Sequence, residues 1–428
     1  MRIYKNIPPE RWPELCQRPK LNTTNLQLVV DEVFARVKAE GDEAVKYYSA
    51  KFDGFAPNPL TVSADEWEEG VAGVPDDLKT AILQAKKNIE LFHQAQAKTT
   101  IEVETSPGVK CWQESRAIQK VGLYIPGGTA PLFSTVLMLA IPAKIAGCEE
   151  IILCTPPDKN GKISAPILYA AKLTGVTQII KAGGIQAIAA LTYGTSVVPQ
   201  VYKIYGPGNQ YVTAAKQKAF SEGTAIDLPA GPSEVMVVAD ETASPVFVAA
   251  DLLSQAEHGI DSQVVCLSNS LSFLEKINRE VENQLPQLPR RDIAKESLKN
   301  ARFLFSDSKE QSLGFINAYA PEHLIIASKD ETYYLENIQN AGSVFIGNYA
   351  PESAGDYLSG TNHTLPTNGF ARSYGSLGLD DFTKKISFQR ITRSGLQNIG
   401  GSIEKMARAE GLEAHARAVE CRLKAITS

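Results

Sequence analysis

Between residues 121 and 220 the chain alternates four times between a short β-type run and a helical segment. The four runs are VGLYI, IILCT, TQIIKA and YKIYG. Parallel strands need crossover connections, which are usually helices, so this alternation predicts a parallel sheet covered by helices. A second series of the same kind extends from EVMVVA at 234–239 to SVFIG at 343–347. The sequence therefore predicts an α/β protein with two parallel sheets.

The segments outside these two series set the expected domains. Helices are expected over 24–53 and 77–97, and the pattern after Gly378 is irregular until a final helix at 412–426. We expect two doubly wound, incomplete Rossmann-like domains with N-terminal helices and a C-terminal helical tail. The expected division is a helical N-terminus and a metal-binding, catalytic α/β domain at 1–120 with 233–378, an inserted nucleotide-binding domain at 121–232, and the tail at 379–428.

Charge and cysteine usage exclude several classes of function. The net charge is −5 and no run of lysine or arginine stands out, which argues against a surface for nucleic acid or for an anionic membrane. The six cysteines lack CxxC spacing, so neither a disulfide framework nor a thiolate zinc site is expected, and a cytoplasmic location fits. The uncharged stretch 121–143 is long enough to span a membrane, but PGG and two further prolines break it. We interpret it as a buried strand, a glycine loop and a buried helix.

Four polar stretches hold four of the five histidines. They are SPVFVAADLLSQAEHG (244–259), APEHLII (320–326), GNYAPESAGDYLSGTNH (347–363) and AEGLEAHARAV (409–419). Each of these histidines has a carboxylate or amide nearby, and such a set without cysteine suits zinc with an open coordination position. Taken singly, the stretches also fit a solvated helix end, a long loop or the start of an ordinary strand. The fifth histidine, His93, is expected to be a surface residue.

Glycine-rich loops lie at the strand–helix junctions of both series. They are LYIPGGTAP (123–131), KAGGIQAIAA (181–190), IYGPGNQYVTAAK (204–216) and LPAGPSEVMV (228–237). None is GxGxxG or a Walker A loop, but a glycine turn before a helix N-terminus can cradle a pyrophosphate. Several such loops at neighbouring strand ends favour a nucleotide site, although tight turns that need positive φ explain some of these glycines.

Seven short strings carry a resemblance to a known family. They are GLYIPGG, YGPGNQYV, DLPAGPSE, DLLSQAEHG, APEHL, PESAGDYLSGTNH and EGLEAH, in this order. On these strings the chain resembles the histidinol dehydrogenases over essentially its whole length. The resemblance implies oxidation of L-histidinol by NAD, through L-histidinaldehyde, to L-histidine, the last steps of histidine biosynthesis. It also implies one zinc ion per active site and a homodimer with exchanged C-terminal tails.

The resemblance also assigns residues. It implies zinc ligands at Gln255, His258, Asp356 and His415, the last from the other subunit, and a catalytic pair at Glu322 and His323. The residues expected around the substrate are Ser233, Gln255, His258, His323, Asp356, His363, Glu410 and His415. The residues expected to contact NAD are Tyr124, Gln186 and Asn209.

These roles fit the chemistry of alcohol and aldehyde oxidation. A histidine is suited to take the proton as hydride leaves an alcohol, and a carboxylate can deprotonate the water that the aldehyde needs. His323 and Glu322 are the expected bases. Two other classes stay open on the residues alone: a zinc-dependent hydrolase in which Glu322 activates metal-bound water, and a non-catalytic nucleotide-binding protein on the same fold. Formation of NADH from histidinol distinguishes both from a dehydrogenase.

Overall fold

A five-stranded parallel sheet forms one half of the body. The computed structural model describes residues 1–19, 25–97, 100–127, 131–228 and 231–427. In this sheet the order is β6-β5-β4-β7-β8. Its strands are β4 (Lys120–Tyr124), β5 (Glu150–Thr155), β6 (Gln178–Lys181), β7 (Lys203–Tyr205) and β8 (Ala225–Ile226), and its connecting helices are α6 (Phe133–Ala146), α7 (Ala165–Thr174), α8 (Gly184–Tyr193) and α9 (Gln210–Ser221).

A six-stranded parallel sheet forms the other half, in the order β1-β11-β10-β9-β12-β13. Its strands are β1 (Ile3–Lys5), β9 (Glu234–Ala239), β10 (Gln263–Ser268), β11 (Arg302–Phe305), β12 (His323–Ala327) and β13 (Ser343–Ile346). Its helices are η1 (Pro9–Arg11), α1 (Trp12–Leu15), α10 (Pro245–Ala256), α11 (Leu271–Gln284), η2 (Leu285–Gln287), α12 (Arg291–Ser297), η3 (Leu298–Asn300), α13 (Lys309–Tyr319), α14 (Glu331–Asn337) and α15 (Glu352–Tyr357). The predicted α/β class with two parallel sheets is confirmed.

The two sheets share one topology. Apart from the additional edge strand β1, the chain enters each sheet in the middle, builds outward to one edge and then crosses to the other side. Both sheets therefore have a switch point between the first and fourth strands, where connections leave in opposite directions. In the five-stranded sheet it lies between β4 and β7, and in the six-stranded sheet between β9 and β12.

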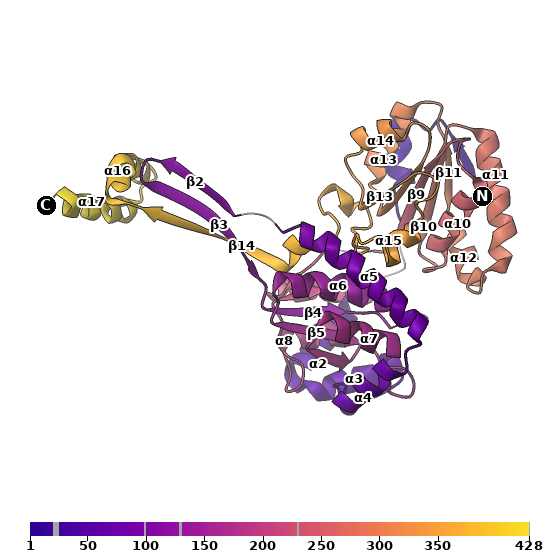
Figure 1. Ribbon diagram of the computed structural model, residues 1–428, viewed down its shortest axis with the longest axis horizontal. Helices are drawn as coiled ribbons and strands as arrows, with labels where there is room; N and C mark the ends of the chain where they lie inside the picture. Colours follow the sequence, from indigo (N-terminus) through magenta and orange to yellow (C-terminus); the bar gives the residue numbers. More distant parts are fainter. Residues whose placement is uncertain (20–24, 98–99, 128–130, 229–230, 428) are drawn as a thin grey trace.

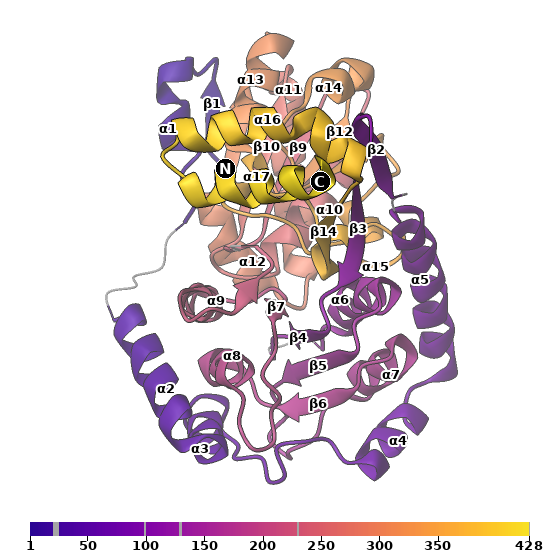
Figure 2. The ribbon, with the colours of Figure 1, turned by 90° about the vertical axis from the view of Figure 1, so that its left-hand side faces the viewer.

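The N-terminal helices correct the expected domain boundary. The helices α2 (Leu26–Glu40), α3 (Asp42–Asp53), α4 (Ala64–Ala72) and α5 (Asp76–Ala95) surround the five-stranded sheet (Figure 2). Phe34 of α2 shares a core with Ile188 of α8, and Ile89 of α5 shares one with Val136 of α6. Grouping these helices with the second sheet was therefore wrong. An apolar helix face predicts burial but does not identify the sheet that buries it.

An arm leaves the body and carries the C-terminus (Figure 1). It is an antiparallel sheet of β2 (Ile101–Ser106), β3 (Val109–Ala117) and β14 (Thr383–Ile391), with α16 (Arg393–Ala409) and α17 (Glu413–Thr427) at its far end. The turns η4 (Phe370–Arg372) and η5 (Leu379–Phe382) precede β14. The predicted helical C-terminal end is confirmed, but the stretch after Gly378 that the sequence left irregular contains β14. Its residues are mostly exposed, so the strand lacks the apolar alternation by which strands are recognised.

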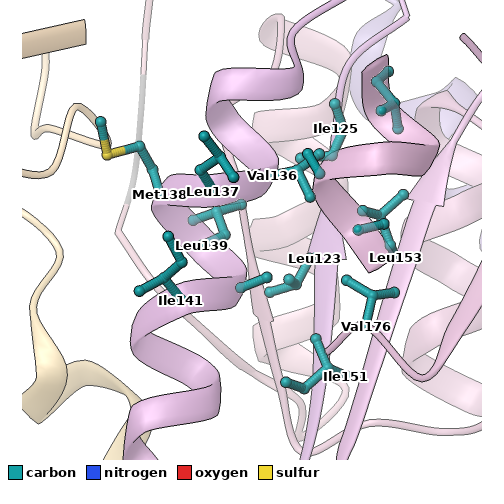
Figure 3. Close-up of a cluster of buried hydrophobic side chains, with 14 of the residues drawn as sticks. Leu123, Ile125, Val136, Leu137, Met138, Leu139, Ile141, Ile151, Leu153 and Val176 are labelled. Atoms are coloured by element: carbon teal, nitrogen blue, oxygen red, sulfur yellow. The ribbon is translucent and has the colours of Figure 1, made fainter. Parts of the chain in front are cut away.

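The strand and helix residues of the uncharged stretch 121–143 lie in the interior. They form most of β4 and most of α6, and ten consecutive residues of that helix are buried. Figure 3 shows Leu137, Leu139 and Ile141 of α6 in a cluster that also contains Leu123 and Leu153 from two strands. Helices pack on both sides of α6, which explains its uniform hydrophobicity. Within the described ranges, no helix is both long and apolar enough to cross a membrane.

Candidate active site

A cavity of about 600 Å³ lies between the two sheets. On one side it is lined by residues that follow β4 and β7, among them Pro126 and Asn209. On the other side it is lined by residues at the start of β9 and β12, among them Ser233, Glu322 and His323. The carboxyl ends of the five-stranded sheet therefore face the amino ends of the six-stranded sheet, at the switch point of each.

The 347–363 loop reaches the cavity from the far end of its sheet. The loop does begin at the carboxyl end of β13, where ligands of such sheets usually bind. However, α15 returns alongside the sheet, and Gly355 packs against the ring of Phe345. Asp356 consequently lies near the amino ends of the strands, with its Oδ1 4.0 Å from Nε2 of His323. The site uses the amino ends of the six-stranded sheet.

Glu322 and His323 face the same cavity because one neighbouring residue holds both. Glu322 lies just before β12, so it is free of the alternation that would direct it to the opposite face. The backbone N–H of Glu234, the first residue of β9, donates to Oε2 of Glu322 at 2.7 Å. The carbonyl of the same residue lies 3.2 Å from Nδ1 of His323. The carboxylate and the imidazole are thereby held 3.7 Å apart, Oε2 to Nδ1.

His323 presents an unprotonated ring nitrogen, so it can act as a base. A carbonyl can only accept, so Nδ1 carries the hydrogen and Nε2 presents its lone pair. In the described part of the chain Nε2 is buried and has no hydrogen-bond partner. Burial lowers the pKa of His323 to about 4, against the opposing effect of the Asp356 charge. Burial also raises the pKa of Glu322 well above its usual value, with a smaller contribution from the Glu234 charge. Such perturbed groups in a cavity are typical of catalytic sites.

Two of the expected metal ligands reach the cavity and a third lies behind it. His258 and Asp356 line the cavity, whereas Gln255, one turn before His258, is fully buried. Neither amide atom of Gln255 has a hydrogen-bond partner within the described ranges, which is unusual for a buried polar group. Nδ1 of His258 lies 2.9 Å from the Ser254 carbonyl, so this nitrogen donates and Nε2 is left to bind a ligand. Metal-binding histidines commonly have this arrangement.

His363 connects the two halves of the site. Its Nδ1 lies 3.0 Å from the Asp356 carbonyl, and its Nε2 lies 3.2 Å from the hydroxyl of Thr135 on α6. Burial lowers the pKa of His363, which favours its neutral form. Like Ser233, it lines the cavity. Both residues thus border the space beside His323, and Nε2 of His363 would exchange the Thr135 hydroxyl for a substrate that bound it.

Glu410 and His415 are not brought to the cavity of their own chain. Both are exposed, and they lie at the ends of α16 and α17, at the far end of the arm (Figure 1). Neither lines the cavity. Among the described residues, no three or more histidine, cysteine, aspartate or glutamate side chains form a group that could hold a metal ion. A single chain therefore lacks one member of the predicted ligand set.

The three residues expected to contact NAD differ in access. Asn209 lines the cavity and caps α9, because its Oδ1 accepts from the N–H groups of Tyr211 and Val212. Tyr124 and Gln186 are buried. The hydroxyl of Tyr124 accepts from the backbone N–H of Gly184, and the amide of Gln186 donates to Asp53 at 2.9 Å.

The glycine loops bring the backbone close to these residues. Gly206, in the loop after β7, has φ +124°, and a Cβ there would lie 2.1 Å from the Tyr124 carbonyl oxygen, so only glycine fits. Residues 128–130 of the first loop and 229–230 of the fourth lie outside the described residues.

His93 corrects a sequence expectation. It was expected at the surface but is fully buried on the face of α5 that also carries Ile82 and Ile89. Its Nδ1 lies 2.9 Å from Oε1 of Gln96, and its Nε2 lies 3.5 Å from the amide of Asn362, next to His363. His93 follows Ile89 by four residues and Ile82 by eleven. Both separations are close to whole helical turns, so the spacing could have shown that His93 shares their face of the helix.

Comparisons with known proteins agree along the whole chain. A family model described as histidinol dehydrogenase matches residues 16–423. Histidinol dehydrogenases of Bacteroides thetaiotaomicron and Bacteroides fragilis are 55% and 57% identical over 426 residues, and each comparison covers 100% of both chains. The crystal structure of histidinol dehydrogenase from Elizabethkingia anophelis is similar at a TM-score of 0.97 with 55% identity, covering 100% of this chain and 99% of that one.

Proposed function

The chain belongs to the histidinol dehydrogenase family of NAD-dependent oxidoreductases, and on that premise we propose that its cavity converts L-histidinol to L-histidine in two oxidations. The observation that carries the proposal is the pairing of Glu322 and His323 by the backbone of Glu234. Both side chains border the cavity that Asn209 lines from the cofactor side. The alternative of a zinc-dependent hydrolase finds no support among the relatives.

The first oxidation needs one base. As hydride leaves the carbinol carbon of histidinol for NAD, Nε2 of His323 takes the hydroxyl proton. Nδ1–H remains bonded to the Glu234 carbonyl and keeps the ring in one orientation. The product is L-histidinaldehyde. Burial of His323 excludes water, which competes for the same proton.

The second oxidation needs water. The carboxylate of Glu322 takes a proton from a water molecule as its oxygen adds to the aldehyde carbon. A carboxylate whose pKa is raised by burial is a stronger base than one in solvent. His323 returns its proton to the carbonyl oxygen as the water adds, and the hydrated aldehyde then loses hydride to a second NAD and a proton to His323. In total, one alcohol, two NAD and one water give one carboxylate, two NADH and three protons.

Zinc belongs to the same proposal. We assign it to Gln255, His258, Asp356 and His415 of the partner subunit. The residues of this chain fit such an ion, because Gln255 has two buried amide atoms without a partner in the described structure, and His258 already donates from Nδ1 to a carbonyl. A bound zinc ion would supply a fixed attachment for the amino and imidazole nitrogens of the substrate. Ser233, His363 and Glu410 would complete the surroundings of histidinol.

NAD would enter from the carboxyl ends of β4 and β7. Asn209 is exposed to the cavity, so it can contact the dinucleotide directly. The amide nitrogen of Gln186 is held by Asp53, whereas its Oε1 has no hydrogen-bond partner among the described residues and would be the atom left to accept from NAD. The hydroxyl of Tyr124 accepts from the backbone N–H of Gly184 and so holds the N-terminus of α8, the helix that carries Gln186.

A homodimer with exchanged tails completes the proposal. Its support is the position of His415, which is exposed at the far end of an arm that extends away from the body (Figure 1). The arm also exposes large apolar side chains, among them Ile386, Met406 and Leu412. Contact with a second copy would bury them. We also propose a cytoplasmic location, because all six cysteines are free and lie within the described residues.

Metal removal and one variant test the zinc assignment. NADH formation from histidinol should cease in chelated protein and return with zinc. His258→Asn should lose activity and zinc while keeping its fold, because His258 is exposed and contributes little to the core. Glu257→Gln, which changes the neighbouring residue outside the cavity lining, is the matched control. Full activity in protein that elemental analysis shows to be free of zinc would contradict the assignment.

A further inference from the structure

Glu234 contacts both catalytic side chains through its backbone, not its side chain. Its N–H donates to Glu322 and its carbonyl accepts from His323. The orientation of both groups therefore depends on where the first residue of β9 lies. Strand pairing fixes β9 beside β12 only from Val235 onward, so Glu234 lies just outside that ladder and is paired on its other side with Gln263 of β10. Its side chain supplies a further constraint.

The carboxylate of Glu234 is fully buried and forms a two-pronged ion pair with Arg18. Nε of Arg18 lies 2.5 Å from Oε2, and one terminal nitrogen lies 2.9 Å from Oε1. The side chain of Arg18 is only 6% exposed and that of Glu234 is 0% exposed. A bidentate guanidinium–carboxylate pair fixes distance and direction together, which a single contact does not. The two residues are far apart in sequence, and their ion pair lies at the amino end of β9.

Arg18 also holds the turn that leads into Glu322. A terminal nitrogen of its guanidinium donates to the carbonyl of Tyr319 at 2.7 Å, and the group lies 3.6 Å from the centre of the Tyr319 ring. Ala320 follows with φ +53°, a left-handed conformation that a residue with a side chain adopts only when its surroundings impose it. One guanidinium thus ties the start of β9 to the turn before β12.

We propose that Arg18 and Glu234 form a positioning pair for the catalytic residues Glu322 and His323. The inference rests on the proposed function, since it presumes that these two residues do the chemistry. The pair transfers no proton. It fixes the Glu234 backbone. As a result, the His323 imidazole presents an unprotonated Nε2, and the Glu322 carboxylate points at the same reaction centre.

Three variants separate positioning from structural support. Arg18→Lys keeps the positive charge but replaces the fork with a single flexible contact. Arg18→Met with Glu234→Gln removes both charges, so no uncompensated charge is buried. Arg302→Met is the matched control, because Arg302 donates to the Gln17 carbonyl at 2.8 Å and has no hydrogen bond to Glu234.

The expected result is a loss in kcat without a loss in binding. A misplacement of about 1 Å at the reacting groups can lower a rate about 10²-fold, so the double variant should lose about that factor in both oxidations. Arg18→Lys should lose about tenfold in kcat, because a single flexible contact displaces the reacting groups by less than the loss of the whole pair. KM for histidinol, zinc content and melting temperature of the double variant should stay near those of the unchanged protein, and Arg302→Met should keep full activity.

Two outcomes overturn the positioning role. One is a double variant or an Arg18→Lys variant with kcat within about threefold of the unchanged protein, since a displacement of the bases costs far more. The other is a loss of kcat accompanied by an equal rise in KM and loss of zinc, which indicates general disorder of the site. His323→Asn in parallel tells the two proposals apart. If it leaves activity intact, the proposed function itself fails; if it abolishes activity while the Arg18 variants keep theirs, only the positioning pair fails.

Discussion

Glu322→Gln should separate the two oxidations. The substitution is isosteric, and the amide retains an oxygen that can accept the Glu234 N–H now 2.7 Å from Oε2. The residue is 6% exposed, so the change creates no new surface. It removes the proton acceptor that only the aldehyde step requires. We therefore expect a folded protein that oxidises histidinol to the aldehyde and then slows.

The magnitudes follow from the two roles of the side chain. A neutral acceptor in place of a charged one weakens the Glu234 hydrogen bond by about 1 kcal/mol, which is about a fivefold loss common to both steps. Removal of a general base costs a further 10²–10⁴-fold, about 3–5 kcal/mol of transition-state stabilisation, in the aldehyde step alone. Aldehyde oxidation should thus fall at least about 10²-fold more than alcohol oxidation.

Separate assays with histidinol and with histidinaldehyde measure the two steps by the absorbance of NADH. A carbonyl-trapping reagent in the histidinol assay prevents the second step from contributing. His323→Asn is the comparison, because each hydride transfer needs that base and both steps should fall together. Equal slowing of both steps by Glu322→Gln would refute the division of roles between the two residues.

Two further predictions address stability and assembly. Burial raises the pKa of Asp53 to about 6, so the fold favours its protonated form and loses stability as pH rises from about 4 to 6. Asp53→Asn should therefore raise the free energy of unfolding by about 1–2 kcal/mol at about pH 7, after allowance for partial exposure. At about pH 4 it should change nothing. If the variant and the unchanged protein had the same urea midpoint at about pH 7 as well as at about pH 4, the prediction would be contradicted. Mixing inactive His415→Asn subunits with inactive His323→Asn subunits should restore part of the activity, because one of the two shared sites then carries neither lesion. Demonstrated subunit exchange without restored activity would show that the tail serves its own chain.

Much of the fold follows from local sequence. Strands such as 234–239 are buried along their whole length, and from Val235 onward this one is an unbroken apolar run, so both parallel sheets were predictable. The placement of α2 and α5 was not, because their apolar faces carry no information about which sheet they cover. Nor was β14, where exposed lysines and glutamine hide the strand period. These features depend on contacts between segments far apart in the chain.

The site likewise contains residues that the sequence could predict and contacts that it could not. Glu322 and His323 could be proposed as site residues because a carboxylate and an imidazole stand side by side at the start of a strand. The contact of both with the backbone of Glu234 could not be predicted, since a backbone group has no signature in the sequence. Arg18 was missed because its partner lies 216 residues away. His93 was misassigned by misjudging its helix face, although its spacing from Ile89 carried the information.

The stoichiometry of the reaction tests the central claim most directly. The purified protein, supplied with histidinol and excess NAD, should form two NADH for each histidine, with no aldehyde left in solution when the reaction ends. A site in which one base serves hydride transfer and its neighbour activates water requires this ratio. One NADH per histidinol, with histidinaldehyde released as the final product, would contradict the account.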